Sequence, residues 1–75
     1  FNPVTNFGFQ IAEPGNVSLT IYDISGKKVE TLIDKEIQPG YYEARWDASA
    51  FSSGVYFYTL ISGSYKETKK MLLIK

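Results

Sequence analysis

The chain lacks cysteine and histidine entirely among its 75 residues. Without cysteine, neither a disulfide scaffold nor a thiolate metal site can form. Without histidine, the usual general base and the commonest metal ligand near neutral pH are missing. A Ser-His-Asp triad is therefore excluded, and the sequence predicts no enzyme, no metal site and no cofactor. Only two carboxylates held at catalytic separation in a pocket would revive an enzymatic interpretation.

Net charge is also absent, because eight Lys and Arg residues balance eight Asp and Glu residues. A nucleic-acid-binding protein needs a basic footprint to replace phosphate counterions, so no nucleic-acid partner is expected. No apolar run approaches the ~20 residues that span a bilayer, which predicts no transmembrane segment. The chain starts at Phe1 rather than Met, without a visible signal peptide. We therefore expect residues 1–75 to be a single domain cut from a larger protein.

Aromatic and aliphatic residues are abundant: 44% of the chain is hydrophobic and 16% is aromatic. A domain of this size without disulfides or metals must bury large side chains to offset its conformational entropy. Aromatic residues bury the most area for little loss of rotamer freedom. This composition favours a compact β-fold with an aromatic core.

Apolar and polar residues alternate along most of the chain, which is the pattern of half-buried strands. No stretch repeats apolar residues at helical spacing, so no helix is expected. The fold class predicted is all-β, a small antiparallel immunoglobulin-like β-sandwich of six to seven strands. The six strands expected cover residues 5–11, 17–22, 27–33, 41–46, 55–61 and 65–74.

Some segments depart from strict alternation and carry more specific expectations. A bulge near Thr31 would reconcile the third strand with its imperfect pattern. Residues 34–40 read as a polar connection, although a seventh short strand could lie in 34–38 or in the loop 47–54. The nearly continuous apolar run 55–61 fits a central strand packed on both faces.

The core and turn residues follow from the same alternation. The turns are predicted to depend on Asp23, whose carboxylate can bond the backbone two residues on, and on Gly26 and Gly54. The predicted core consists of Phe7, Phe9, Val17, Leu19, Ile21, Trp46, Tyr56, Tyr58 and Leu60.

The aromatic residues also admit a second interpretation. Tyr41, Tyr56 and Tyr58 together with Trp46 could form a stacking platform for a carbohydrate on one sheet. Core packing and cross-strand pairing account for the same residues. The chain could then be a non-catalytic immunoglobulin-like spacer or a carbohydrate-binding module attached to a secreted glycoside hydrolase.

Five segments occur in a fixed order along the chain: FNPVT at 1–5, VSLTIYDISGKKV at 17–29, PG at 39–40 before WD at 46–47, SGVYFYTL at 53–60 and TKKMLLIK at 68–75. Together they resemble the C-terminal sorting domain (type A) of proteins exported by the type IX secretion system of Bacteroidetes-like bacteria. The hairpin motif Tyr-Asp…Gly and the later Gly-Val-Tyr are shared with the related flagellar hook-capping immunoglobulin-like domain.

The resemblance implies a role in protein export. Such a domain is carried in cis by a secreted enzyme or adhesin, crosses the periplasm and is recognised by the outer-membrane secretion machinery. A sortase-like peptidase commonly removes it, and the cargo reaches the outer-membrane surface or the medium.

The end of the chain is the candidate site of this recognition. Its lysines are also the kind of edge residue that blocks aggregation between sheets. An exposed edge strand offers its backbone to a partner sheet, while alternate side chains supply specificity. The candidate recognition residues are Lys69, Lys70, Met71, Leu72, Leu73, Ile74 and Lys75.

Overall fold

The computed structural model describes residues 3–74. Within them every regular element is a strand, which confirms the all-β prediction. The alternation of apolar and polar residues along each segment explains this, because it places one face of every strand in the interior. The six strands are β1 Val4–Ile11, β2 Gly15–Asp23, β3 Lys28–Ile37, β4 Gly40–Asp47, β5 Gly54–Ser62 and β6 Tyr65–Leu73.

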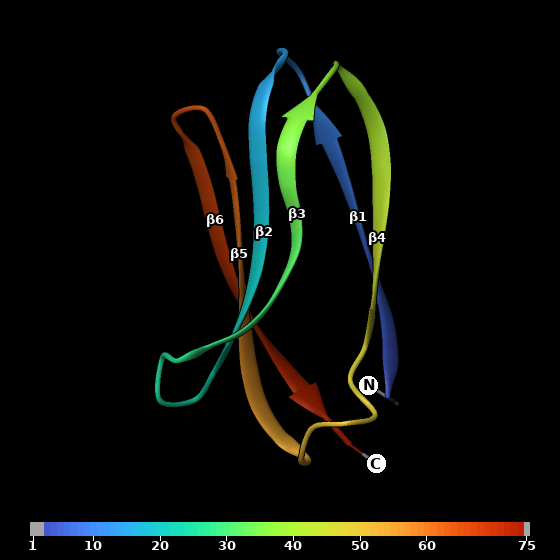
Figure 1. Ribbon diagram of the computed structural model, residues 1–75, viewed down its shortest axis with the longest axis vertical. Coiled ribbons are helices and arrows are strands. Elements are labelled where there is room, and N and C mark those ends of the chain that lie inside the picture. Colours follow the sequence, from blue (N-terminus) through green and yellow to red (C-terminus); the bar gives the residue numbers. More distant parts are fainter. Residues whose placement is uncertain (1–2, 75) are drawn as a thin grey trace.

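The strands form two antiparallel sheets that face each other as a sandwich (Figure 1). One sheet contains only β1 and β4, whereas the other has the order β3-β2-β5-β6. Ring contacts place β1 and β4 over the larger sheet: Phe7 of β1 lies 4.7 Å from Tyr58 of β5, centroid to centroid. The two-stranded sheet therefore covers only part of the four-stranded sheet, and β6 lies at an edge of the four-stranded sheet.

The core occupies the space between the two sheets. Eight of the nine residues predicted for it are at most 8% exposed, with Trp46, Val17 and Ile21 fully buried. Tyr58 is the exception. It packs against the core but is only half-buried, because its neighbour on β6 is the exposed Lys69. The buried set also includes Ile11, Ile37, Ala48 and Leu73, which lie at strand ends or in segments expected to be polar.

β3 is longer and less regular than the sequence predicted. Its pairing with β2 shifts twice, so that Leu32 and Val29 have no partner in the register. The first irregularity adjoins Thr31, where a bulge was expected. The shifts let Val29, Leu32 and Ile33 all pack against the core, which strict alternation would forbid.

The expectation of a polar connection at residues 34–40 is wrong over its first half. Residues 34–37 continue β3, and no separate seventh strand occurs in residues 3–74. Ile37 is 6% exposed at the end of this strand and supplies the burial that keeps the segment in the sheet.

The turn between β2 and β3 is built around one carboxylate. Oδ1 of Asp23 accepts hydrogen bonds from the backbone N–H of Ser25 at 2.9 Å and of Lys27 at 3.0 Å. Gly26 has φ of 87°, a conformation that costs a glycine little and other residues more. Gly54, the third predicted turn residue, instead begins β5.

β5 is central, as predicted, because it pairs with both β2 and β6. The expectation that both of its faces are packed is met only in part, because Thr59 on the outer face is 8% exposed but no layer from the described residues covers that face. Tyr56 and Leu60 point into the core, but Ile61 on the other face is 39% exposed. The two-stranded sheet covers only the inner face of β5, and the described residues form no layer over its outer face.

Candidate recognition site

β6 carries the predicted recognition residues at an edge of the four-stranded sheet. Among residues 3–74 it pairs with β5 alone, from Tyr65 opposite Ser62 to Leu73 opposite Gly54. Its other side therefore offers backbone N–H and C=O groups that no described strand pairs. This is the geometry required for strand addition by a partner.

Alternate residues of β6 have different surroundings. On the inner face Met71 lies opposite the core residue Tyr56 and is itself partly buried, and Leu73 is only 1% exposed. Lys69 shares this face but reaches the rim, where its Nζ lies 3.8 Å from Glu67 Oε2. Such an exposed pair contributes little to stability. The inner face thus anchors the strand.

The outer face of the same segment is open to solvent. Lys70 is exposed opposite the half-buried Phe57, and Leu72, 53% exposed, lies opposite Val55. Ile74, just beyond the strand, is 56% exposed. We call Lys70, Leu72 and Ile74 the outer row. Lys75, the last predicted recognition residue, lies outside the described residues.

The sequence prediction therefore groups residues that the structure places on two faces. Sequence reasoning treated residues 69–75 as one segment and missed the division between anchor and exposed row. The period of two that identified the strand already carried this signal. It also missed Thr68, whose hydroxyl lies 3.0 Å from the hydroxyl of Thr59 and links β6 to β5 on the outer face.

An aromatic cluster supports the base of β5 and β6. Trp46 contacts Phe51 and Tyr56 with centroid distances of 5.6 Å and 5.5 Å. The indole N–H of Trp46 donates to Glu30 Oε1 at 3.1 Å and ties β4 to β3 across the sandwich. The Tyr56 hydroxyl donates to the backbone oxygen of Ser52 at 2.7 Å. These contacts fix the position of β5. Because β6 pairs with β5, they also fix the position of β6 at the edge of the sheet.

The four aromatic residues considered as an alternative stacking platform for a carbohydrate do not share one exposed face. Trp46 is fully buried and Tyr56 is 7% exposed, because both belong to the core between the sheets. Tyr41 is separated from them on the outer face of β4 and is 64% exposed. Its hydroxyl lies over Gly8, where a Cβ would collide with it. A single exposed tyrosine remains of the four proposed residues.

Two aspartates outside β6 have perturbed acidities. The Ser25 hydroxyl, followed by the Lys27 backbone N–H, lowers the pKa of Asp23. The Ser49 hydroxyl and backbone N–H lower the pKa of Asp47 in the same way. Each carboxylate accepts hydrogen bonds from residues of its own turn, and both carboxylates therefore stabilise loops. In residues 3–74 no three Asp or Glu residues gather as metal ligands would.

Comparison with known protein families identifies the family of this chain. Residues 2–75 match the family described as secretion system C-terminal sorting domain, which spans nearly the whole chain. No curated protein and no solved structure matches the chain. The segment of residues 3–74 contains no helix long and apolar enough to cross a membrane. With an all-β sandwich whose last strand is exposed at an edge, and with this family match over residues 2–75, the chain belongs to the C-terminal sorting domains of the type IX secretion system.

Proposed function

We propose that the outer-membrane translocon of the type IX system reads the last strand of this domain, and does so chiefly through the outer row and the edge of β6 that no described strand pairs. The domain is a C-terminal sorting signal, and it marks the protein that carries it for export to the cell surface or the extracellular space. A sorting signal is itself the object that is recognised, which fits a domain without catalytic activity.

The single observation that carries the proposal is the division of β6 into two faces. Leu73 and Met71 fix the strand to the core, so the strand is presented without being free to leave the sheet. Lys70, Leu72 and Ile74 then stand at a spacing of two residues, which a partner sheet can read side chain by side chain. The lysine adds electrostatic steering and register more than affinity.

The route of export supplies the rest of the proposal. The parent enzyme or adhesin crosses the periplasm with this domain folded at its end. The translocon pairs with the β6 edge, and a sortase-like peptidase then removes the domain. Lys69 would add basic character at the rim of the inner face, and Lys75 follows the outer row in the sequence.

Deletion of residues 69–75 is a poor test, because it removes the buried Leu73 together with the outer row. Substitution on the outer face is sharper. A reporter with a periplasmic signal peptide and this domain at its C-terminus is expressed in a type IX-competent bacterium. We expect Lys70→Glu to lower the exported fraction about fivefold, the effect of an exposed charge pair worth about 1 kcal/mol.

Lys35→Glu is the matched control, because Lys35 is exposed on β3 at the opposite edge of the same sheet. It changes net charge by the same amount and is expected to leave export unchanged. Both variants must show the urea midpoint of the parent domain. Equal export by the two variants, with both folded, would refute the assignment of the outer row.

A further inference from the structure

Two lysines on the outer face of β6 carry charge that no carboxylate in residues 3–74 balances. Lys66 and Lys70 stand four residues apart, and both are exposed on the same face of the strand. Their neighbours on β5 are apolar, with Ile61 opposite Lys66 and Phe57 opposite Lys70. Neither lysine forms an ion pair with another described residue. The outer face of this edge therefore has two uncompensated positive charges.

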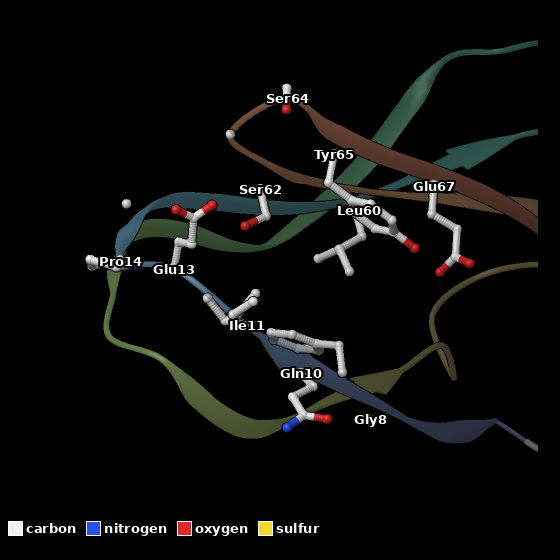
Figure 2. A pocket seen from close by; sticks show the side chains of 14 residues that line it. Gly8, Gln10, Ile11, Glu13, Pro14, Leu60, Ser62, Ser64, Tyr65 and Glu67 are labelled. Carbon is white, nitrogen blue, oxygen red and sulfur yellow. The ribbon is translucent and has the colours of Figure 1, made fainter.

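The inner face of the same edge differs in charge and is left open. Nζ of Lys69 lies 3.8 Å from Oε2 of Glu67, so the two charges of this face balance each other. A groove of about 500 Å³ lies between β1 and this part of β6, and Tyr65 and Glu67 line it (Figure 2). The two-stranded sheet does not cover the edge of β6 here, which leaves room for the inner side chains of an added strand.

A row of threonines crosses the larger sheet and ends between the two lysines. Thr31 of β3, Thr20 of β2, Thr59 of β5 and Thr68 of β6 are successive cross-strand partners. The hydroxyls of Thr59 and Thr68 lie 3.0 Å apart. Directly opposed residues of neighbouring strands interact on one face, and threonine pairs at such positions stabilise a sheet. The row stops at Thr68, on the edge that no described strand pairs, and a hydroxyl residue on an added strand would extend it.

The charges of the edge select the kind of strand that can be added. Such a strand places one residue opposite each of Lys66, Thr68 and Lys70, all on the outer face. Opposite charges at these positions are favourable and like charges are unfavourable. The complementary strand has two acidic residues four positions apart with a hydroxyl residue midway. A second copy of β6 does not meet this requirement, because antiparallel pairing about Thr68 places Lys66 of each copy opposite Lys70 of the other.

We propose that residues 65–71 bind an acidic strand of a partner protein, which adds to β6 as a fifth strand of the larger sheet with its carboxylates opposite Lys66 and Lys70. Backbone hydrogen bonds along the edge give affinity, and the two lysines give register and choice of partner. This inference rests on the proposed function, because the translocon would supply the strand. It adds Lys66 as a residue that selects the partner.

A labelled seven-residue peptide is the probe, with valine at its odd positions and glutamate, threonine and glutamate at its even positions. Its binding to the 75-residue chain is measured by fluorescence anisotropy at physiological salt, and amide exchange locates the bound peptide. We expect binding that protects backbone amides within residues 65–71.

Two comparison peptides separate charge from register. The first has lysine in place of both glutamates and is expected not to bind, because like charges then face each other. The second exchanges the threonine with one glutamate, so that the composition is unchanged but the acidic residues stand two positions apart. Only one of them can then lie opposite a lysine of the outer face. Binding should weaken about threefold, since one exposed charge pair is worth up to about fivefold.

The matched variants exchange the charges of the edge. Lys66→Glu combined with Lys70→Glu is expected to reverse the preference, so that the lysine peptide binds and the glutamate peptide does not. Lys27→Glu combined with Lys35→Glu makes the same change in net charge at exposed positions outside β6. It is expected to leave binding within about twofold, because salt screens distant charges. Both double variants must keep the urea midpoint of the parent chain.

Three results of the binding assay would overturn the proposal. Equal affinity for the two glutamate peptides would show charge attraction without strand register. Protection on β1 or β3 in place of β6 would show that a different edge binds the peptide. Protection of β6 that rises with protein concentration in the absence of peptide would show that a second copy of this chain occupies the edge.

Export of the reporter separates this inference from the proposed function. The acidic strand predicts that Lys66→Glu lowers the exported fraction as Lys70→Glu does. A loss of export with Lys70→Glu alone would refute the acidic strand and leave the role of the outer row in place. Binding of the glutamate probe together with full export of both single variants would support the acidic strand and refute the proposed function.

Discussion

Leu73 and Leu72 are adjacent, chemically identical and close to the end of the last strand, yet the structure predicts that they differ sharply in their contribution to stability. Leu73 is 1% exposed, whereas Leu72 is 53% exposed on the outer face. Leucine-to-alanine substitution in a core costs about 2–5 kcal/mol, depending on how far the site can collapse. The residue opposite Leu73 on β5 is Gly54, which has no side chain to fill the space.

We therefore expect Leu73→Ala to lower the free energy of unfolding by about 3–4 kcal/mol, near the middle of the core range. A 75-residue domain has a total stability of about 4–11 kcal/mol, so this loss is a large fraction of it. Leu72→Ala is expected to cost less than about 1 kcal/mol, because it removes one exposed cross-strand contact.

Urea denaturation followed by intrinsic fluorescence measures both values. Trp46 is the only tryptophan of the chain and is fully buried, so its emission reports unfolding. With a urea dependence of about 1 kcal/mol/M, Leu73→Ala should lower the midpoint by about 3–4 M and Leu72→Ala by less than about 1 M. Coinciding midpoints for the two variants would refute the division of β6 into an anchoring and an exposed face.

Two further predictions concern the loops and the tie between sheets. Glu30→Ala removes the acceptor of the Trp46 indole N–H and should cost about 1 kcal/mol or more, whereas Glu30→Gln keeps an acceptor oxygen and should recover most of it in the same urea assay. The folded-state pKa of Asp23 lies below its unfolded value, so the stability from its hydrogen bonds is fully present above the unfolded pKa of about 4 and is lost as the pH falls through the folded pKa. Asp23→Ala should thus flatten the dependence of the urea midpoint on pH below about 4, and an unchanged dependence would contradict the role given to the carboxylate.

The strands and the core were predictable because alternation is a local signal. Val17, Leu19 and Ile21 follow a period of two without interruption, and all are at most 1% exposed. Residues 34–37 were misjudged because their composition is polar. Ile37 alone among them is buried, and a single apolar residue does not make a pattern.

The failures at the site have a different physical origin. Exposure of an aromatic residue depends on which sheet covers it, and this is a property of strand order that the sequence does not specify. Tyr56 and Tyr41 both lie on strands, but only Tyr56 points toward the opposite sheet, whereas Tyr41 points to solvent. The open groove of about 500 Å³ between β1 and β6 could not be predicted for the same reason, because it arises where the two-stranded sheet faces the four-stranded sheet.

Export of a reporter tests most directly whether this domain is a sorting signal. A reporter directed to the periplasm is fused at its C-terminus to residues 1–75 and expressed in a type IX-competent bacterium and in a matching strain without the translocon. The sorting function predicts that the reporter reaches the cell surface or the medium in the first strain and stays in the periplasm in the second. Retention in the periplasm of the competent strain, with the domain shown to be folded, would contradict it.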